Sequence, residues 1–266
     1  MDIDRFWQMI DQARAAAGPQ ADQAVRDVDD SDESDDPEQD YWDFDEEELQ
    51  ALVDQARAEL DADDQGDAPS EDEDEYDDEE DELTDPVAIA LFELLVGCSA
   101  AQIADFDNTF EEVRARGDTP ELSLAATLIE HGLVGEDGFD DFRAGLVALG
   151  RTTFEAALAD PDSLADHPVV REIAAAPDPR WLGREDVLFV ASQAYAEVTG
   201  EDAVTFFDFA ESLRDADSGI ESPVGEPWDI EDEAKTRARL PRLSHLFYER
   251  SLRNRRRALD RLGLPR

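Results

Sequence analysis

The segment from Gly138 to Leu164 carries the clearest helical pattern in the chain. Its apolar side chains recur every three or four residues, which places them on one face of a helix: Phe139, Phe142, Leu146, Leu149, Phe154 and Leu158. A corner at Gly150–Arg151 divides the segment into two short helices, and Asp160-Pro161-Asp162 ends the second one. The apolar face of this pair must therefore be buried against other elements of the fold.

The same spacing recurs along most of the chain and predicts helices at residues 4–17, 45–60, 86–96, 99–117, 120–131, 168–175, 186–199, 203–213 and 243–262. The following aromatic residues are expected in the core: Phe6, Trp7, Phe106, Phe110, Phe139, Phe142, Phe189 and Tyr195. The helix that Pro86 opens should point four residues inward: Ile89, Phe92, Leu95 and Val96. No useful length alternates with period two, so the sequence predicts an all-α fold. We expect a single orthogonal or irregular bundle with a disordered acidic insertion and a C-terminal basic helix.

Acidic residues are concentrated in one part of the chain. The whole sequence has 71 acidic and 23 basic residues and a formal net charge of −48. Between Asp27 and Asp85 there are 32 acids and a single base, Arg57. Residues 61–82 are of low complexity and bury too little apolar area to offset the cost of ordering, so we expect disorder there. Such a charge argues against nucleic-acid or anionic-membrane binding by the surface as a whole.

Four aromatic side chains lie inside this acidic segment: Tyr41, Trp42, Phe44 and Tyr76. Acidic segments with interleaved rings dock on basic partners, because charge steers the encounter and the rings anchor it. The alternative is a linker that only keeps the protein soluble. The expected partner is therefore an unknown basic protein, or the basic tail of the same chain.

Residues 235–266 reverse the sign of the charge, with 11 bases and two acids. A helix here presents four arginines along one strip: Arg250, Arg253, Arg257 and Arg261. This strip suits phosphate or nucleic acid, and it equally suits the chain's own acidic segment, which is tethered at high effective concentration. Nucleic acid is thus expected only through this helix.

The domain organisation follows from these charge changes. Residues 1–18 form the first helix of a helical domain, 19–82 an acidic insertion with one possible helix at 45–60, 83–247 the main helical domain, and 248–266 the basic helix. The helix at 45–60 repeats the sequence DQARA of the first helix. Partial duplication and chance recurrence in an Ala/Arg/Asp-rich chain both explain the repeat.

One group of carboxylates is a candidate for chemistry. Asp137, Asp140 and Asp141 precede Arg143 on one predicted helix, and carboxylates on a shared face bind a divalent cation or act as acid and base. The alternative is structural, with Asp137 capping the helix and the others forming a solvated face paired with Arg143.

No residue is assigned as catalytic, and no cofactor is expected. Cys98 is the only cysteine and no Cys/His cluster suits zinc. The three histidines lie far apart, and we expect His131 at a helix C-terminus, where a cation is favoured. Arg151 and Asp160 are expected to form a buried pair between the two central helices.

The N-terminal pattern is acidic and amphipathic rather than that of a signal peptide, and the longest apolar run, Val87–Gly97, is too short to span a bilayer. A cytoplasmic protein without a membrane segment is expected.

The central segment also resembles a known family. Gly138, Phe139, Phe142, Arg143, Gly150 and Arg151, followed by Asp160, Pro161, Asp162 and Leu164, match the hallmark D-G/S-F-x-x-F-R-x-x-L-x-x-x-G-R and D-P-D-S-L of the bacterial domain-of-unknown-function family 4240. Similarity to this family extends over residues 1–18 and 83–247, with the acidic segment as an insertion. The resemblance implies an all-helical domain and no established activity.

Three functions follow as hypotheses. The first is a non-enzymatic helical interaction module whose acidic segment binds a basic protein surface or the basic tail. The second is a nucleic-acid-linked regulator that uses the arginine-rich helix and is inhibited by the acidic segment. The third is a hydrolase or metal binder at the carboxylates of residues 137–141.

Overall fold

A computed structural model describes residues 1–25, 83–132, 134–214 and 230–261, with side chains placed up to residue 259. In these ranges the chain is helical and contains no β-strand; a single isolated bridge joins Val25 to Trp181. The elements are α1 (Ile3–Ala17), the 3-10 helix η1 (Gly18–Asp22), α3 (Pro86–Leu95), α4 (Ala100–Ala115), α5 (Pro120–Ile129), α6 (Glu136–Ala148), α7 (Arg151–Ala159), the 3-10 helix η3 (Pro161–Asp166), α8 (Pro168–Ala175), α9 (Asp186–Thr199), α10 (Ala203–Leu213), α11 (Glu233–Arg239) and α12 (Pro241–Arg261). The predicted all-α fold is confirmed.

Local capping explains where these helices begin and end. The Asp85 carboxylate accepts from the backbone N–H groups of Val87 and Ala88, with Pro86 at the first position of α3. Helix α9 ends at Gly200, which takes the left-handed conformation at φ 73°. These boundaries agree with the sequence predictions because each cap uses residues adjacent in the chain.

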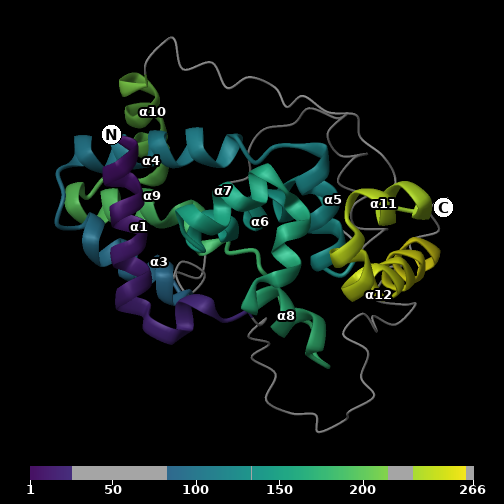
Figure 1. The fold of residues 1–266 in the computed structure, drawn as a ribbon. Coiled ribbons are helices and arrows are strands. Elements are labelled where there is room, and N and C mark those ends of the chain that lie inside the picture. Colours follow the sequence, from purple (N-terminus) through teal and green to yellow (C-terminus); the bar gives the residue numbers. More distant parts are fainter. Residues whose placement is uncertain (26–82, 133, 215–229, 262–266) are drawn as a thin grey trace, which may run out of the picture. The chain divides into compact units, whose positions relative to one another are not determined.

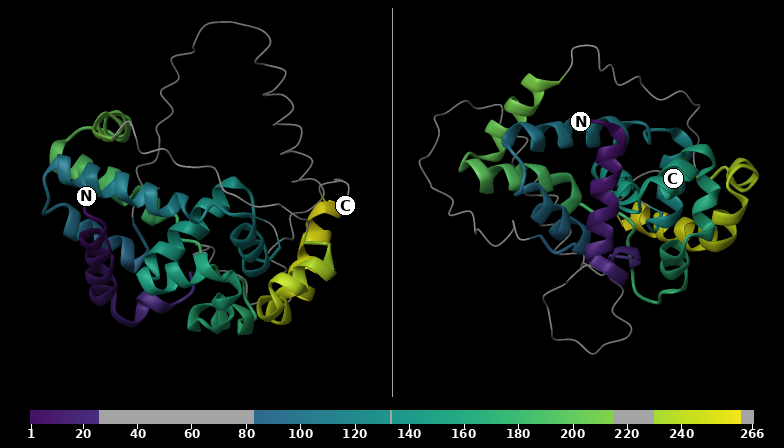
Figure 2. Two further views of the ribbon diagram at one scale, coloured as in Figure 1. Left: turned by 45° about the horizontal axis from the view of Figure 1, so that its top comes forward. Right: turned by 60° about the vertical axis from the view of Figure 1, so that its left-hand side comes forward.

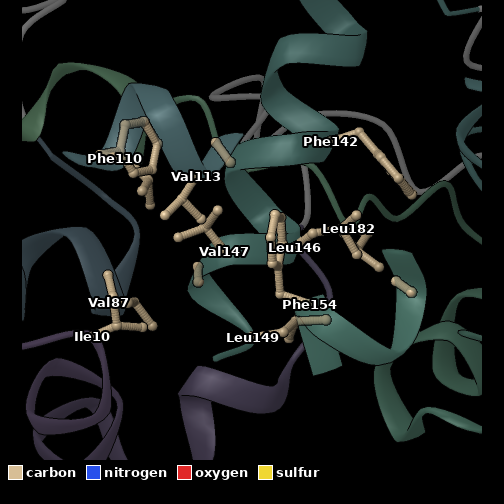
Figure 3. Close-up of a cluster of buried hydrophobic side chains, with 14 of the residues drawn as sticks. Ile10, Val87, Phe110, Val113, Phe142, Leu146, Val147, Leu149, Phe154 and Leu182 are labelled. Carbon is tan, nitrogen blue, oxygen red and sulfur yellow. The ribbon is translucent and has the colours of Figure 1, made fainter. Parts of the chain in front are cut away.

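The helices of the described residues pack in a continuous series (Figures 1 and 2). Helix α1 lies against α3, α3 against α9, and α9 against α4 and α10, while α12 packs on α5 and η3. Helices α6 and α7 cross the middle. Figure 3 shows the buried side chains there, with Val147 beside Val113, and Leu146 next to Leu182 of the segment before α9. Of the six apolar side chains predicted on this pair of helices, Phe142, Leu146, Leu149 and Phe154 are buried, whereas Phe139 and Leu158 are only partly buried.

The predicted inward faces of α3 and α9 are partly wrong. Ile89 on α3 is 40 % exposed and Phe189 on α9 is 44 % exposed. The two helices start side by side, where both Thr84 and Asp85 donate a backbone N–H to the Asp186 carboxylate at 2.6 Å. The side chains that are buried here are Val87, Ala88 and Leu91 on α3, and Val187 and Val190 on α9. Periodicity located the apolar stripe of each helix, but the packing of the pair decides which edge of the stripe is covered.

The segment from Trp181 to Asp186 contacts the chain on both sides of residues 26–82. Val25 and Trp181 exchange both backbone hydrogen bonds at 2.9 Å. The buried guanidinium of Arg184 donates to the Gln23 carbonyl at 3.0 Å and pairs with Asp85 at 2.5 Å. The chain therefore leaves this core and re-enters it at neighbouring places. The predicted helix at 45–60, and with it the proposed repeat, lies outside the described residues.

Candidate functional site

The central α6–α7 segment positions the candidate residues. Phe142 and Phe154 are completely buried, which fixes the two helices in the core. Between them Gly150 has φ 90°, a conformation that L side chains rarely adopt, so glycine is required at this corner. Phe139 is only partly buried; its ring lies under the Arg143 guanidinium, 4.7 Å from the centroid. The outer face of α6 therefore carries the charged groups.

These groups form a carboxylate–arginine network between α4 and α6. Asp140 pairs with Arg143 on its own helix and with Arg114 of α4 at 2.9 Å, and Arg114 also pairs with Glu111 at 2.6 Å. Burial alone would raise the pKa of Asp140, but the hydrogen bonds and positive charges of Arg114 and Arg143 lower it overall. Asp140 is thus an ionised, doubly paired carboxylate that joins the two helices.

Two nearby carboxyl groups behave in the opposite way. Burial raises the pKa of Asp107 on α4 to about 7, and the negative charge of Glu111 adds to the effect. Burial likewise raises the pKa of Asp141 to about 6, with contributions from Glu185, Asp140 and Asp137. Strongly shifted carboxyl groups occur at acid–base sites and in structural networks alike.

The structure does not support the metal site that the sequence suggests at Asp137, Asp140 and Asp141. Across the described ranges, no group of three or more His, Cys, Asp or Glu side chains could hold a metal ion. Asp140 is already neutralised by two guanidinium groups. The expectation that Asp137 caps the helix is wrong, because α6 begins at Glu136 with Gly135 in the capping position. The network is best described as ion pairs that join α4 to α6.

The second half of the hallmark segment holds helix α12. The buried Asp162 carboxylate accepts from the backbone N–H groups of Arg242 at 3.0 Å and Leu243 at 2.9 Å, at the start of α12. It also accepts from Arg242 Nε at 3.1 Å, while the other nitrogens of this guanidinium reach Asp160 and Asp166. A carboxylate at a helix N-terminus satisfies free N–H groups and complements the helix dipole.

The predicted buried pair of Arg151 with Asp160 is therefore wrong. Arg151 is 43 % exposed and pairs with Asp4 of α1 and Glu155 of α7. Asp160 pairs instead with Arg242 and caps η3 by accepting from the backbone N–H of Asp162. The sequence around Arg151 and Asp160 does not indicate this change of partner, because Arg242, which pairs with Asp160, lies 82 residues further along the chain.

A comparison with protein-family models matches residues 38–197 to the family described as "Protein of unknown function (DUF4240)". The chain belongs to the DUF4240 family. No curated protein and no solved structure matches it. The family match covers α3 to α8 and most of α9, including the whole hallmark segment from Gly138 to Leu164.

The limits of the DUF4240 match differ from those expected from the resemblance. The match starts at residue 38, inside the acidic segment, and ends at residue 197, before α10. Helix α1 lies outside it, although Phe6, Trp7 and Ile10 are buried in the same core as the matched helices. In this DUF4240 protein the core thus contains elements beyond the matched region.

The basic strip of this DUF4240 member is only partly free. Arg250 turns into the body, where its guanidinium donates to His131 Nδ1 at 2.9 Å and to the Ile173 carbonyl at 3.3 Å. His131 lies just after the end of α5, at the helix C-terminus where it was expected; it is buried at φ 60° beside Trp181 and joins α5 to α12. Arg253 and Arg257 are exposed, and the side chain of Arg261 lies outside the described residues.

Other predicted sites cannot be placed. Tyr41, Trp42, Phe44 and Tyr76 fall in the undescribed range 26–82. None of the helices in the described part combines the length and the apolar composition needed to cross a bilayer.

The sequence analysis missed two features of this DUF4240 chain. One is the buried pair of Arg184 with Asp85, for which a separation of 99 residues gives no local signal. The other is the outer face of α10, where Val204 is 72 % and Phe207 51 % exposed. A signal for the second existed, because the helix AVTFFDFAESL has more apolar residues than one buried face holds.

Proposed function

We propose that this protein is a non-enzymatic helical interaction module whose acidic segment, residues 27–85, engages a basic protein surface. The observation that supports it is the distribution of charge. Residues 27–85 hold 32 acidic side chains and one basic side chain, Arg57, and so contribute 31 of the 48 net negative charges. The described body, in contrast, pairs its own arginines with its own carboxylates, such as Arg114 with Glu111 and Asp140.

The aromatic residues of the segment suit this role. Negative charges at such density attract a basic partner over a long range. The release of counterions when the partner binds adds to the affinity. Tyr41, Trp42, Phe44 and Tyr76 add apolar area, which gives the contact a lifetime beyond that of a purely electrostatic encounter. The proposal therefore has two separable parts, attraction by charge and anchoring by rings.

The described core offers a direct test, because its attachment points are close together. Gln23 and Asp85 contact the same guanidinium, that of Arg184. Residues 27–82 can thus be replaced by a short Gly/Ser linker without separating α1 from α3. Circular dichroism and thermal unfolding of this linker variant test whether the helical body remains folded.

The experiment measures binding of a small, stable basic protein to the full chain and to the linker variant by isothermal titration calorimetry. We expect binding by the full chain that weakens as salt rises, and loss of binding in the linker variant. A third protein, with Tyr41, Trp42, Phe44 and Tyr76 all changed to serine, keeps the charge. We expect it to bind about tenfold more weakly with an unchanged salt dependence. Equal affinity of all three proteins would overturn the proposal.

A second candidate is a nucleic-acid-linked regulator, favoured by the exposure of Arg253 and Arg257 on α12. The acidic segment would then occupy the basic helix and exclude nucleic acid. In that case the linker variant gains salt-sensitive binding to DNA or RNA in a gel shift, and Arg253→Glu with Arg257→Glu removes it. Absence of binding by the linker variant rejects this candidate.

A further inference from the structure

The outer face of α10 is an unusual surface for so acidic a protein. Val204 and Phe207 are 72 % and 51 % exposed, and they lie three residues apart, on one face of the helix. Figures 1 and 2 show α10 beside α9 and α4, away from α12. Exposed apolar side chains that stand together indicate a surface that meets another molecule.

The opposite face of α10 is firmly held, so this exposure is not a sign of a loosely attached helix. Phe206 is completely buried and its ring packs against Tyr195 of α9 at 5.1 Å. The Ala210 carbonyl accepts from Asn108 Nδ2 of α4 at 2.9 Å, and Arg214 donates to Asn108 Oδ1 at 3.0 Å. Val204 and Phe207 are therefore presented on a fixed support, which reduces the entropic cost of binding.

Exposed carboxylates lie on the same face of α10 and at the turn that precedes it. Asp208 and Glu211 follow Val204 and Phe207 at four-residue spacing on the same face of α10, and Glu197 and Glu201 stand exposed where α9 ends and the chain turns into α10. None of the four forms an ion pair with a basic side chain in the described part of the chain. The α10 surface, meaning these six residues, is thus an apolar centre with an unpaired acidic rim.

This charge pattern selects one kind of occupant. A second copy of the chain would bring the acidic rim against itself, because a two-fold interface pairs the same patch on both subunits, and like charges in contact oppose association. A helix with leucine-like residues on one face and lysines or arginines on its flanks instead satisfies both the centre and the rim.

We infer that the α10 surface is the docking site for a basic amphipathic helix of a partner protein. The inference deepens the proposed function, since it rests on a basic protein as the partner, and it adds a second apolar contact, on the folded body. Phe207 is the central anchor, Val204 extends the apolar contact, and Asp208 and Glu211 fix the orientation by pairing with cationic side chains.

The probe is a synthetic peptide of leucine and lysine, about five helical turns long, with the leucines on one face. A second peptide has the same composition in an order that forms no apolar face, so it reports attraction by charge alone. Fluorescence anisotropy measures both affinities for the full-length protein at physiological salt. We expect the amphipathic peptide to bind about tenfold more tightly than the scrambled one.

Two variants locate the contact. Val204→Ser with Phe207→Ser should remove the preference for the amphipathic peptide and leave the affinity for the scrambled peptide unchanged. Asp208→Lys with Glu211→Lys should weaken binding of the amphipathic peptide by about tenfold and reduce the salt dependence of that binding. Leu246→Ser on α12 is the matched control, because Leu246 is also exposed, at 37 %, but on another helix. It should bind like the wild type.

The outcomes separate this inference from the proposed function. If the linker variant that lacks residues 27–82 keeps the peptide preference and the serine variant loses it, the docking site stands and the acidic segment is not the binding element. If the serine variant keeps the preference and the linker variant loses all binding, the docking site is wrong and the proposed function stands. Concentration-dependent dimerisation that the serine variant abolishes would show a second copy on the surface and overturn the inference.

Discussion

Arg184 and Asp85 form a nearly fully buried ion pair, with Nη1 2.5 Å from Oδ2 across 99 residues of sequence. The second terminal nitrogen of the same guanidinium donates to the carbonyls of Ala21 and Gln23 at 3.0 Å. Asp85 in turn caps α3. One arginine thus links the end of η1, the start of α3 and the segment that leads into α9.

Arg184→Met should lower the free energy of unfolding by about 3 to 5 kcal/mol, because it leaves a buried carboxylate without its counter-charge. Urea denaturation measures the change. The double variant Arg184→Met with Asp85→Asn should recover part of the loss, since asparagine still caps the helix without a charge. A loss below about 1 kcal/mol in the single variant would contradict a structural role for the pair.

Gly145 and Gly138 lie on the same helix and should respond oppositely to alanine. A Cβ at Gly145 would lie 2.1 Å from the Leu182 carbonyl oxygen, so the segment before α9 has to move, whereas a Cβ at Gly138 meets nothing closer than 3.7 Å. We expect Gly145→Ala to cost about 2 kcal/mol or more and Gly138→Ala to stabilise α6 by up to about 1 kcal/mol. Thermal unfolding compares the two. Equal effects would show that the close approach is absent in solution.

Asp162→Ala should detach the start of α12. The carboxylate accepts two backbone N–H groups there, and without it those donors remain unsatisfied next to the core, a cost of about 2 to 3 kcal/mol. Hydrogen exchange of the α12 amides should become faster, together with tryptic cleavage at its arginines. Asp166→Ala is the control, because that carboxylate is 62 % exposed and its pair with Arg242 contributes little. Unchanged exchange in Asp162→Ala would contradict the capping role.

Asp107 should make stability depend on pH. Burial raises the pKa of its carboxyl from 3.8 to about 7 in the folded protein, so well below pH 3.8 the group is protonated in both states and its full stabilising contribution is present. As the pH rises to about 7 the unfolded state ionises first, and that contribution is lost. Asp107→Asn should therefore gain stability over the wild type through this range, by roughly 4 kcal/mol at most.

Urea unfolding of both proteins at several pH values provides the measurement. Asp208→Asn is the matched control, since Asp208 is exposed. A difference between Asp107→Asn and the wild type that stays constant with pH would contradict the raised pKa.

The helix boundaries were predictable because they depend on neighbours in sequence. Asp85 before Pro86, Gln102 three residues after Ser99, and the glycine at position 200 each satisfy or end a helix through local backbone groups. The family assignment was predictable for a similar reason, since its hallmark is a contiguous motif.

Tertiary partners were not predictable in the same way. Nothing near Arg250 in the sequence indicates that it bonds to His131, 119 residues away, and so the strip of four arginines expected on α12 loses one member to the core. Exposed apolar residues were missed for a related reason. Phe189 has the spacing of a core residue, and only the placement of α9 against its neighbours shows that this ring faces outward.

The attachment of α12 has a consequence for the order of folding. Its contacts span long stretches of chain: Asp162 reaches Leu243 across 81 residues, and Ser251 donates to the Leu128 carbonyl across 123. Closing such loops costs more chain entropy than forming the α6–α7 corner, so these contacts form late. Refolding should therefore pass through a species with the central helices in place and the α5–η3 surface still bare, which is the stage most prone to aggregation.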